Sequence, residues 1–277
     1  MSSSSDFDFD EIGYWSEIKL EIVRKYAKAY STILSRQRLE HVYVDGFAGA
    51  GVHVARSTGE FVAGSPLNAL LIDPPFKEFF LIDMDAGKAE HLRELTRDRT
   101  NVHIYDGDSN QILLEEVFSK IRYQDYRRGL CLLDPYGLHL DWKVIQTAGQ
   151  MKSLEIFINF PVADMNRNVF WHDASKVSPE QANRLTGFWG DESWKEAGYS
   201  GAGDLFGHPE KQPNEVIAQA FRERLKNVAN FKYVPGPMPM RNSRGAIIYY
   251  LFFASPNPVA SKIVTDIFDS YRNQGIR

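Results

Sequence analysis

The sequence predicts an α/β fold of the Rossmann-like type: a mostly parallel, seven-stranded sheet with an antiparallel C-terminal strand and helices on both faces. Between residues 41 and 160, short apolar runs alternate with helical patterns, which favours βαβ units. These runs are apolar almost throughout, as expected for strands that are covered on both faces. Two further strand-like runs near the C-terminus predict an antiparallel addition to the sheet.

The composition is that of an ordinary globular protein. Of the 277 residues, 43% are hydrophobic, which is enough for a substantial core. No apolar run approaches the roughly 20 residues that span a bilayer. The Ser- and Asp-rich N-terminus predicts a short disordered tail and no secretory signal. The single cysteine, Cys131, lies in an apolar run and is expected to be buried. We therefore expect a cytoplasmic protein without a membrane partner.

The first part of the chain is predicted to hold one helix, followed by five strands that alternate with four helices. Residues 16 to 35 place Ile18, Ile22, Tyr26 and further apolar residues at helical spacing. Ser65 is the expected N-cap of a helix that Pro66 begins. The five strands are predicted at 41–45, 79–83, 102–105, 129–133 and 154–160, and the helices between them at 65–71, 86–97, 109–121 and 142–151.

The second part of the chain begins with a segment that breaks this pattern. We predict a mostly helical and loop insertion near the substrate side at 162–213, carrying Trp171, Trp189 and Trp194. Helices at 214–226 and 259–271 then flank strands at 231–235 and 245–254. The predicted organisation is a tail and helix packed on the core (1–40), a ligand-binding half (41–161), the insertion (162–213) and the rest of the same domain (214–277).

The most informative segment is 42–51, in which a predicted strand ends at Asp45 and continues into a glycine-rich turn. Glycines let the backbone approach a ligand closely, although a purely structural tight turn is the alternative. The turn resembles motif I of class I methyltransferases, in its Asp-x-Phe-x-Gly-x-Gly form. This resemblance implies S-adenosyl-L-methionine as the cofactor, bound at Asp45, Gly46, Phe47, Gly49 and Gly51. A nicotinamide site fits worse because Val54 stands where the third glycine belongs.

Acidic residues also follow the next two predicted strands. Asp83 is predicted to accept the ribose hydroxyls, while Met84 packs on the adenine and Asp85 caps the following helix. In the methyltransferase pattern, the third strand tip holds an acid for the adenine amino group, and Asp108 matches it best. A helix N-cap is an equally good interpretation of Asp108.

Asp134, Pro135 and Tyr136 are the predicted catalytic residues, at the tip of the fourth strand. They resemble the Asp/Asn-Pro-Pro-Tyr/Phe motif of amino-directed methyltransferases, minus one proline. In those enzymes, oxygens of the motif accept hydrogen bonds from the target NH2, whose lone pair attacks the methyl group, while the aromatic ring stacks on a base. An ordinary Asp-Pro turn is the alternative. Asp73–Phe76 matches the letters better but precedes a strand, so we predict a structural turn there.

Three further residues are predicted to bind the substrate side of the site. Asn159 and Phe160 end the fifth strand at the same edge and are expected to line the acceptor pocket. Lys19 either reaches the methionine carboxylate or is a solvated helix lysine. The histidines show no ligand spacing, so no metal is predicted.

Taken together, the segments resemble the three-Cys-motif partner protein (TcmP) family. The matching pieces, in order, are Gly13–Glu17 with Lys19–Leu20, Tyr43–Gly51, Gly64–Pro66, Leu133–Gly137, Asn159–Pro161 and Tyr249–Ala254. The resemblance implies a Rossmann-like methyltransferase fold. It also implies a partner: a three-Cys-motif protein that resembles radical-SAM enzymes, of the phage Gp37/Gp68 type.

The sequence therefore predicts a class I SAM-dependent methyltransferase acting on an amino group, with RNA or DNA as the acceptor. The tryptophans of the insertion would stack on a base, and the basic loop from Arg241 to Arg244 would contact phosphates. The alternative for the tryptophans is a small local core. A non-catalytic or partner-activated binding protein of the same fold is the alternative. A nicotinamide-dependent oxidoreductase is disfavoured by the glycine pattern.

Overall fold

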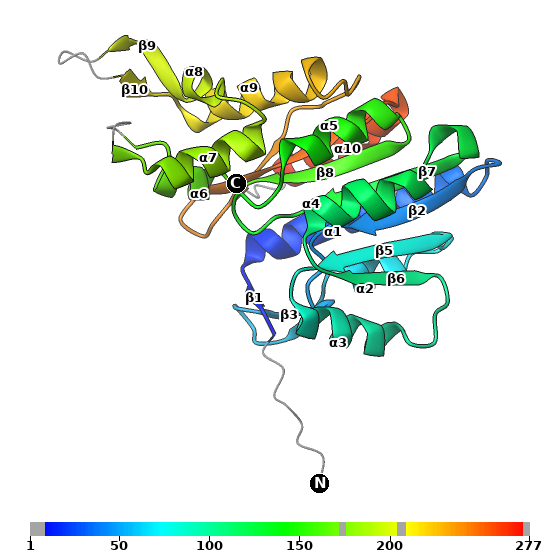
Figure 1. Ribbon diagram of the computed structural model, residues 1–277. Helices are drawn as coiled ribbons and strands as arrows, with labels where there is room; N and C mark the ends of the chain where they lie inside the picture. Colours follow the sequence, from blue (N-terminus) through cyan, green and yellow to red (C-terminus); the bar gives the residue numbers. More distant parts are fainter. Residues whose placement is uncertain (1–8, 172–175, 204–208, 274–277) are drawn as a thin grey trace.

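A twisted seven-stranded sheet runs through the centre of the computed structural model, which describes residues 9–171, 176–203 and 209–273 (Figure 1). The predicted disordered tail falls largely outside these residues. From one edge to the other, the sheet contains β11 (Met238–Arg241), β12 (Ile247–Ala254), β8 (Leu154–Phe160), β7 (Arg127–Leu133), β2 (Glu40–Asp45), β5 (Glu78–Asp83) and β6 (Val102–Asp106).

Strand directions confirm the predicted fold class. Strands β6, β5, β2, β7 and β8 are parallel, β12 is antiparallel to β8, and β11 is antiparallel to β12. The chain starts in the middle at β2, adds β5 and β6 on one side, and then crosses to β7 and β8 on the other. The strand order thus reverses between β2 and β7, and in open α/β sheets ligands bind outside the carboxyl ends of the strands at such a point.

Helices cover both faces of the sheet. One face packs against α1 (Tyr14–Leu34), α2 (Ser65–Leu70), α3 (Ala86–Thr96) and α10 (Pro258–Asn273). The other packs against α4 (Ser109–Ile112) and the irregular turns that continue it to Lys120, α5 (Trp142–Met151), α7 (Pro179–Trp189) and α9 (Asn214–Asn227). Each face therefore has its own apolar core, which explains why the strands lack polar alternation.

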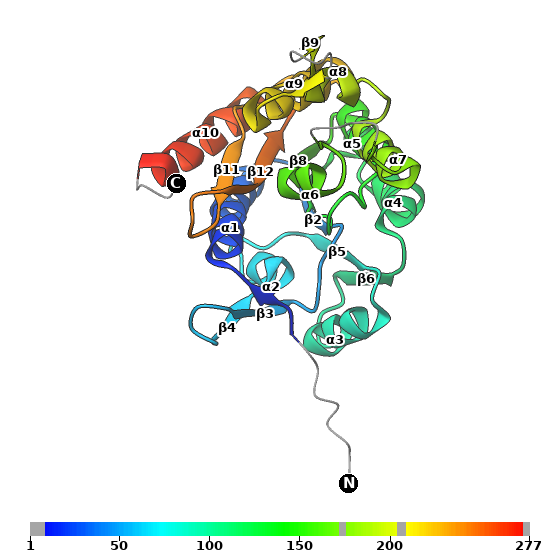
Figure 2. The ribbon, with the colours of Figure 1, turned by 90° about the vertical axis from the view of Figure 1, so that its left-hand side faces the viewer.

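Helix α1 packs a broad face onto the sheet. Ile18, Ile22 and Tyr26 are buried as predicted, whereas Ile33 is exposed and Leu34 takes its place. Lys19 is only 7% exposed, so a charged group enters this face close to the helix N-terminus. Figure 2 views the sheet along its strands and shows α1 next to β11.

A buried carboxyl group beneath α1 is expected to make stability depend on pH. The Tyr26 hydroxyl donates to Glu155 of β8, yet burial raises the pKa of Glu155 from 4.5 to about 7. Because the folded state binds this proton more tightly than the unfolded chain, the free energy of unfolding should fall as pH rises from about 4.5 to about 7. In Glu155→Gln this contribution, about 3 kcal/mol at most, should vanish.

Urea unfolding of both proteins at pH 5 and pH 8 measures the difference. The buried Asp45, whose pKa is raised to about 6, adds a similar decline in both proteins. The comparison therefore isolates Glu155, and an identical pH dependence of the two proteins would contradict the assignment.

The segment after β8 packs onto the main core. It contains α6 (Val162–Asn168), α7, α8 (Trp194–Gly198), β9 (Tyr199–Gly203) and β10 (Pro209–Lys211). Trp189 and Trp194 are buried in the core around β8 and α9, so they cannot stack on a base, while Trp171 is 40% exposed. Figure 2 shows α6 and α7 at the end of the sheet where the parallel strands finish.

Two features of the sheets differ from the predictions. The strand expected at 231–235 is wrong: only Tyr233 forms a bridge, to Ser255, and the edge strand is β11. Pro239 lies within β11, which an edge strand tolerates because one side of it forms no ladder. A small second sheet, which was not predicted, joins β1 (Glu11–Ile12) to β3 (Val52–Ala55) and β4 (Phe61–Ala63). Strands β3 and β4 directly follow the glycine turn.

Candidate functional site

The predicted site residues of the central strands meet at one edge of the sheet. Strand β2 ends at Asp45 and β5 at Asp83, while Asp134 directly follows β7. The parallel register aligns Asp45 with Leu132 of β7 and with Leu81 of β5, so the three tips are neighbours. The structure thus brings together the glycine turn, the second acidic tip and the Asp-Pro-Tyr segment.

The glycine turn is tied to the strands on both sides. Gly49 N donates to Asp83 Oδ2 at 2.7 Å, and Gly46 N donates to the carbonyl oxygen of Leu132 at 3.0 Å. Gly49 has φ +64°, a conformation that side chains disfavour. A Cβ built on Gly49 would approach one atom of His53, at 3.7 Å, so the space above the turn is open. A Cβ on Gly51 would instead lie 2.9 Å from Leu92, so that glycine serves packing.

Asp45 supports this turn from below. Its carboxyl group is fully buried and accepts from Phe47 N at 3.2 Å and from the Tyr43 hydroxyl at 3.3 Å. Burial raises its pKa to about 6, although a hydrogen bond from Ser65 opposes the rise. The prediction that Ser65 caps α2 is wrong because Gly64 is the N-cap. Ser65 was not predicted to belong to the site, and no short-range pattern connects it with Asp45.

The carboxylate of Asp83, at the tip of β5, is held by two hydrogen bonds and can accept more. Asp83 Oδ1 accepts from Asp85 N at 2.9 Å, and Asp83 Oδ2 accepts from Gly49 N. Each carboxylate oxygen keeps a second lone pair. Met84 is 73% exposed at the tip. Asp85 caps α3 as predicted, with Gly87 N at 2.8 Å. Asp108 caps α4 through Gln111 N at 2.9 Å, so its N-cap role is confirmed.

Asp134 accepts hydrogen bonds from two side chains that are distant in sequence. Lys19 Nζ donates to Asp134 Oδ2, and Asn159 Nδ2 donates to Asp134 Oδ1 at 2.8 Å. Burial lowers the pKa of Lys19, but the charge and hydrogen bond of Asp134, together with Tyr249 and Asp45, raise the pKa overall, so the lysine stays protonated. The interpretation of Lys19 as a solvated lysine is therefore wrong. Among the described residues, Asn159 Oδ1 is buried without a hydrogen-bond partner.

The residues after Asp134 present an aromatic ring to solvent. Pro135 is buried, whereas Tyr136 is 93% exposed. Gly137, at φ +65°, lies against Asp164 of α6 and Arg184 of α7. The predicted substrate contact of Phe160 is wrong, because its ring is fully buried among aromatic side chains that include Phe188, Phe221 and Phe252. Residues alternate along a strand, so Asn159 faces Asp134 while Phe160 faces the core.

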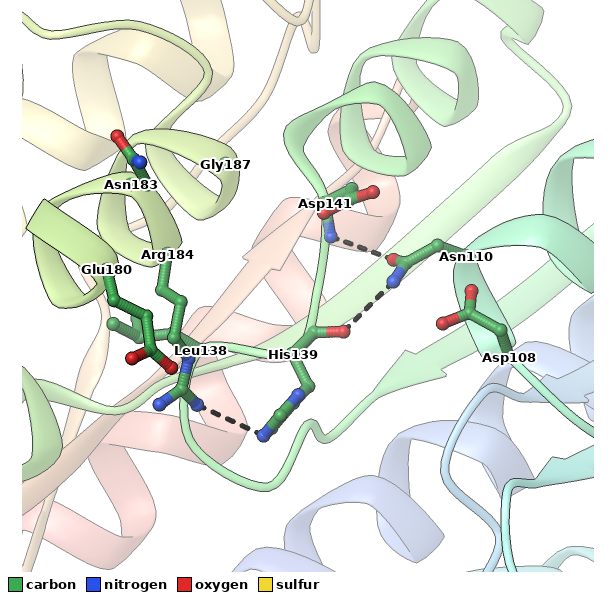
Figure 3. A pocket seen from close by; sticks show the side chains of 9 residues that line it. All are labelled: Asp108, Asn110, Leu138, His139, Asp141, Glu180, Asn183, Arg184 and Gly187. Atoms are coloured by element: carbon green, nitrogen blue, oxygen red, sulfur yellow. Dashed lines mark hydrogen bonds between the residues drawn. The ribbon is translucent and has the colours of Figure 1, made fainter.

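A cavity of about 700 Å³ lies between the start of α4, the loop at 138–141 and α7 (Figure 3). Arg184 Nη2 donates to His139 Nε2 at 3.0 Å, and Asn110 joins α4 to the loop through the backbone of His139 and Asp141. The lining contains three carboxylates, from Asp108, Asp141 and Glu180, and one arginine, Arg184, so it is net negative. Its residues are individually unremarkable in sequence, which is why only Asp108 was predicted.

In the ranges that the structure describes, no group of three or more His, Cys, Asp or Glu side chains is arranged to hold a metal ion. None of the helices described is both long and apolar enough to cross a membrane.

Comparisons with known proteins show similarity of fold. No family model and no curated protein sequence matches the chain. The chain is similar to the crystal structure of protein LPL1258 from Legionella pneumophila, a DUF519 protein, with a TM-score of 0.54 and 12% identity over 93% of this chain and 91% of that one. This likeness shows a shared fold.

Weaker similarities involve proteins that are described as methyltransferases. The CurJ carbon methyltransferase has a TM-score of 0.38 and 12% identity over 82% of this chain and 53% of that one. PKMT2 from Rickettsia typhi, solved in complex with AdoHcy, has a TM-score of 0.33 and 13% identity over 82% of this chain and 39% of that one. TM-scores this low carry no conclusion about this chain.

Proposed function

We propose that the protein is an S-adenosyl-L-methionine-dependent methyltransferase that methylates an amino group, with a nucleobase of RNA or DNA as the acceptor. The observation that carries the proposal is the position of Asp134. It stands at the tip of β7, at the point where the strand order reverses, between the glycine turn and the exposed ring of Tyr136. A carboxylate, a stacking surface and a cofactor turn are the parts that amino-directed methyl transfer needs.

The residues around the glycine turn fit the cofactor. The open space above Gly49 admits a ligand against the backbone, and the free lone pairs of Asp83 suit ribose hydroxyls. The exposed Met84 offers an apolar surface to the adenine, and Asp108 lies in the lining of the adjoining cavity. When bound, S-adenosylmethionine supplies an electrophilic methyl group on its sulfonium.

The chain's own residues position the acceptor. Lys19 and Asn159 hold the Asp134 carboxylate in one orientation through their hydrogen bonds to its two oxygens. Asp134 accepts an N–H of the target amino group, which fixes the direction of the nitrogen lone pair. Tyr136 stacks on the ring that bears this group, and orientation of the reactants supplies much of the rate.

A nucleic acid would place its base and its phosphates on different surfaces. The cavity beside Asp108 is net negative and would repel phosphates. Arg241 ends β11, and Arg244 lies exposed in the loop that joins β11 to β12. We therefore place the base at Tyr136 and the phosphate backbone on this loop.

A second candidate is a protein of the same fold that becomes active only with a partner. The observation that favours it is that both oxygens of Asp134 already accept hydrogen bonds from Lys19 and Asn159. The resemblance to three-Cys-motif partner proteins identifies a radical-SAM-like cysteine-motif protein as the partner to test.

Isothermal titration with S-adenosylmethionine, S-adenosylhomocysteine and NADH tests the cofactor assignment. We expect the first two ligands to bind and NADH not to bind. Asp83→Ala should weaken binding by about 10- to 100-fold, because it removes a charged acceptor of the ribose and releases Gly49 N.

Asp85→Ala is the matched control for this titration. This neighbouring carboxylate caps α3, so its loss should cost about 1 kcal/mol of stability but no affinity. Selective binding of NADH would replace the proposal with a nicotinamide site. Binding of none of the ligands by a folded sample would leave the second candidate, to be tested with the partner present.

A further inference from the structure

His53 lies directly above the glycine turn, on a strand that the sequence patterns did not predict. Strand β3 follows Gly51, and its pairing with β1 and β4 fixes the backbone of His53 opposite Val62. A Cβ built on Gly49 would lie 3.7 Å from the Cε1 atom of the imidazole, and one built on Gly64 would lie 3.1 Å from its Nε2 atom. The ring is thus held between two glycines, beside the open space above the turn.

One nitrogen of this ring is buried without a partner. Within the part of the chain that the structure describes, His53 Nδ1 is inaccessible to solvent and makes no hydrogen bond. Proteins rarely bury a polar atom in this state, because its desolvation is not compensated. A ligand that enters the space above Gly49 would supply the missing partner.

Charged groups around His53 indicate the chemistry of that partner. The pKa of the imidazole is lowered, mainly by burial and then by the positive charges of Lys19 and Lys88. The negative charges of Asp10 and Asp134 oppose this effect only in part. The ring is neutral at pH 7, so one of its nitrogens carries a proton that it can donate. Lys19 and Lys88 already form ion pairs, with Asp134 and Asp10 respectively.

Carboxylates at the strand tips, by contrast, are plentiful. Asp45 and Asp83 both lie at this edge of the sheet, beside the glycine turn, and would attract the ammonium group of an amino-acid moiety. Lys19 and Lys88 each donate to a carboxylate of the protein, whereas His53 Nδ1 has no partner within the described residues.

We propose that His53 donates from Nδ1 to the carboxylate at the amino-acid end of S-adenosylmethionine, and so selects cofactors that carry this group. The inference rests on the proposed function, since it requires the cofactor to occupy the glycine turn. It assigns His53 a role in binding and positioning.

Decarboxylated S-adenosylmethionine is the probe that isolates this contact, because it keeps the sulfonium and the amine but lacks the carboxylate. Titration of the full-length protein should show tighter binding of S-adenosylmethionine than of the decarboxylated probe. In His53→Phe the affinity for S-adenosylmethionine should fall by about 10- to 100-fold, as for a lost hydrogen bond to a charged group, while the affinity for the probe stays unchanged.

Controls separate this contact from packing. His103→Phe changes an imidazole on β6 that stacks on Phe80, and it should alter neither affinity. If His53→Phe does not fold, His53→Gln provides the same comparison with a smaller expected loss, because the amide keeps an N–H donor.

Equal weakening of the binding of both ligands would show that His53 only packs the turn. Unchanged affinities would show that His53 contacts neither ligand. Both results overturn the inference. Failure of the unsubstituted protein to bind either ligand would instead refute the proposed function itself.

Discussion

Asp134→Ala is expected to slow methyl transfer by about 100- to 1000-fold, a loss typical of a removed electrostatic group at a reacting centre. Affinity for S-adenosylmethionine should change little, because Asp134 faces the acceptor rather than the glycine turn. The rate is measured as transfer of label from tritiated S-adenosylmethionine to bulk RNA and to single-stranded DNA. Affinity is measured by titration on the same samples.

The stability of this variant must be followed in parallel. Removing Asp134 leaves the ammonium group of Lys19 buried without its partner, which costs about 3–5 kcal/mol for a fully buried pair and less here because Asp134 is partly exposed. Asp134→Asn keeps the shape and an acceptor oxygen, so it should fold better and lose less activity. Asp106→Ala, at the exposed tip of β6, is the matched control and should be active. Full turnover in Asp134→Ala would remove this residue from the mechanism.

The fold was predictable because its strands are apolar on both faces. Apolar runs such as Phe79–Asp83 and Gly129–Leu133 would expose hydrophobic side chains if one face of the sheet met solvent. The sequence therefore predicted where these strands lie and that they are parallel. The exception was the C-terminal edge. There β11 contains Pro239 and buries only every second residue, and the more β-like run at 231–235 was chosen instead.

The candidate site was predictable only in part, for a different reason. Asp45, Asp83 and Asp134 were found because parallel strands end at one edge, so a local pattern fixes where their tips lie. Lys19 and Asn159 were assigned to the site, but the pairing of Lys19 with Asp134 and the contact of Ser65 with Asp45 were not predicted, because both depend on the packing of separate elements. The pair of Lys19 and Asp134 spans 115 residues. The signal available in sequence was helical spacing, since Lys19 lies four residues before the buried Val23 and seven before the buried Tyr26.

The wrong prediction for Phe160 came from a single-residue shift along a strand. Asn159 and Phe160 both end β8, but alternation directs one to Asp134 and the other to the aromatic core. Phe160 should have been assigned to the core from the apolar residues at every second position before it, Ile156 and Ile158.

Gly49→Val is expected to remove cofactor binding, with a loss of about 10- to 100-fold or more in affinity, because the new side chain would fill the space above the turn. Valine at φ +64° also strains the backbone by about 1–2 kcal/mol, so a loss of binding alone would not separate steric blockage from misfolding.

Gly59 offers the control. It has φ +71°, and a Cβ there meets nothing within 4 Å. Gly59→Val should therefore suffer the same strain in the turn between β3 and β4, with a similar drop in melting temperature, while it keeps its affinity for S-adenosylmethionine. If the two variants lose affinity equally, the effect is one of stability, and the glycine turn is then a structural turn rather than a ligand site.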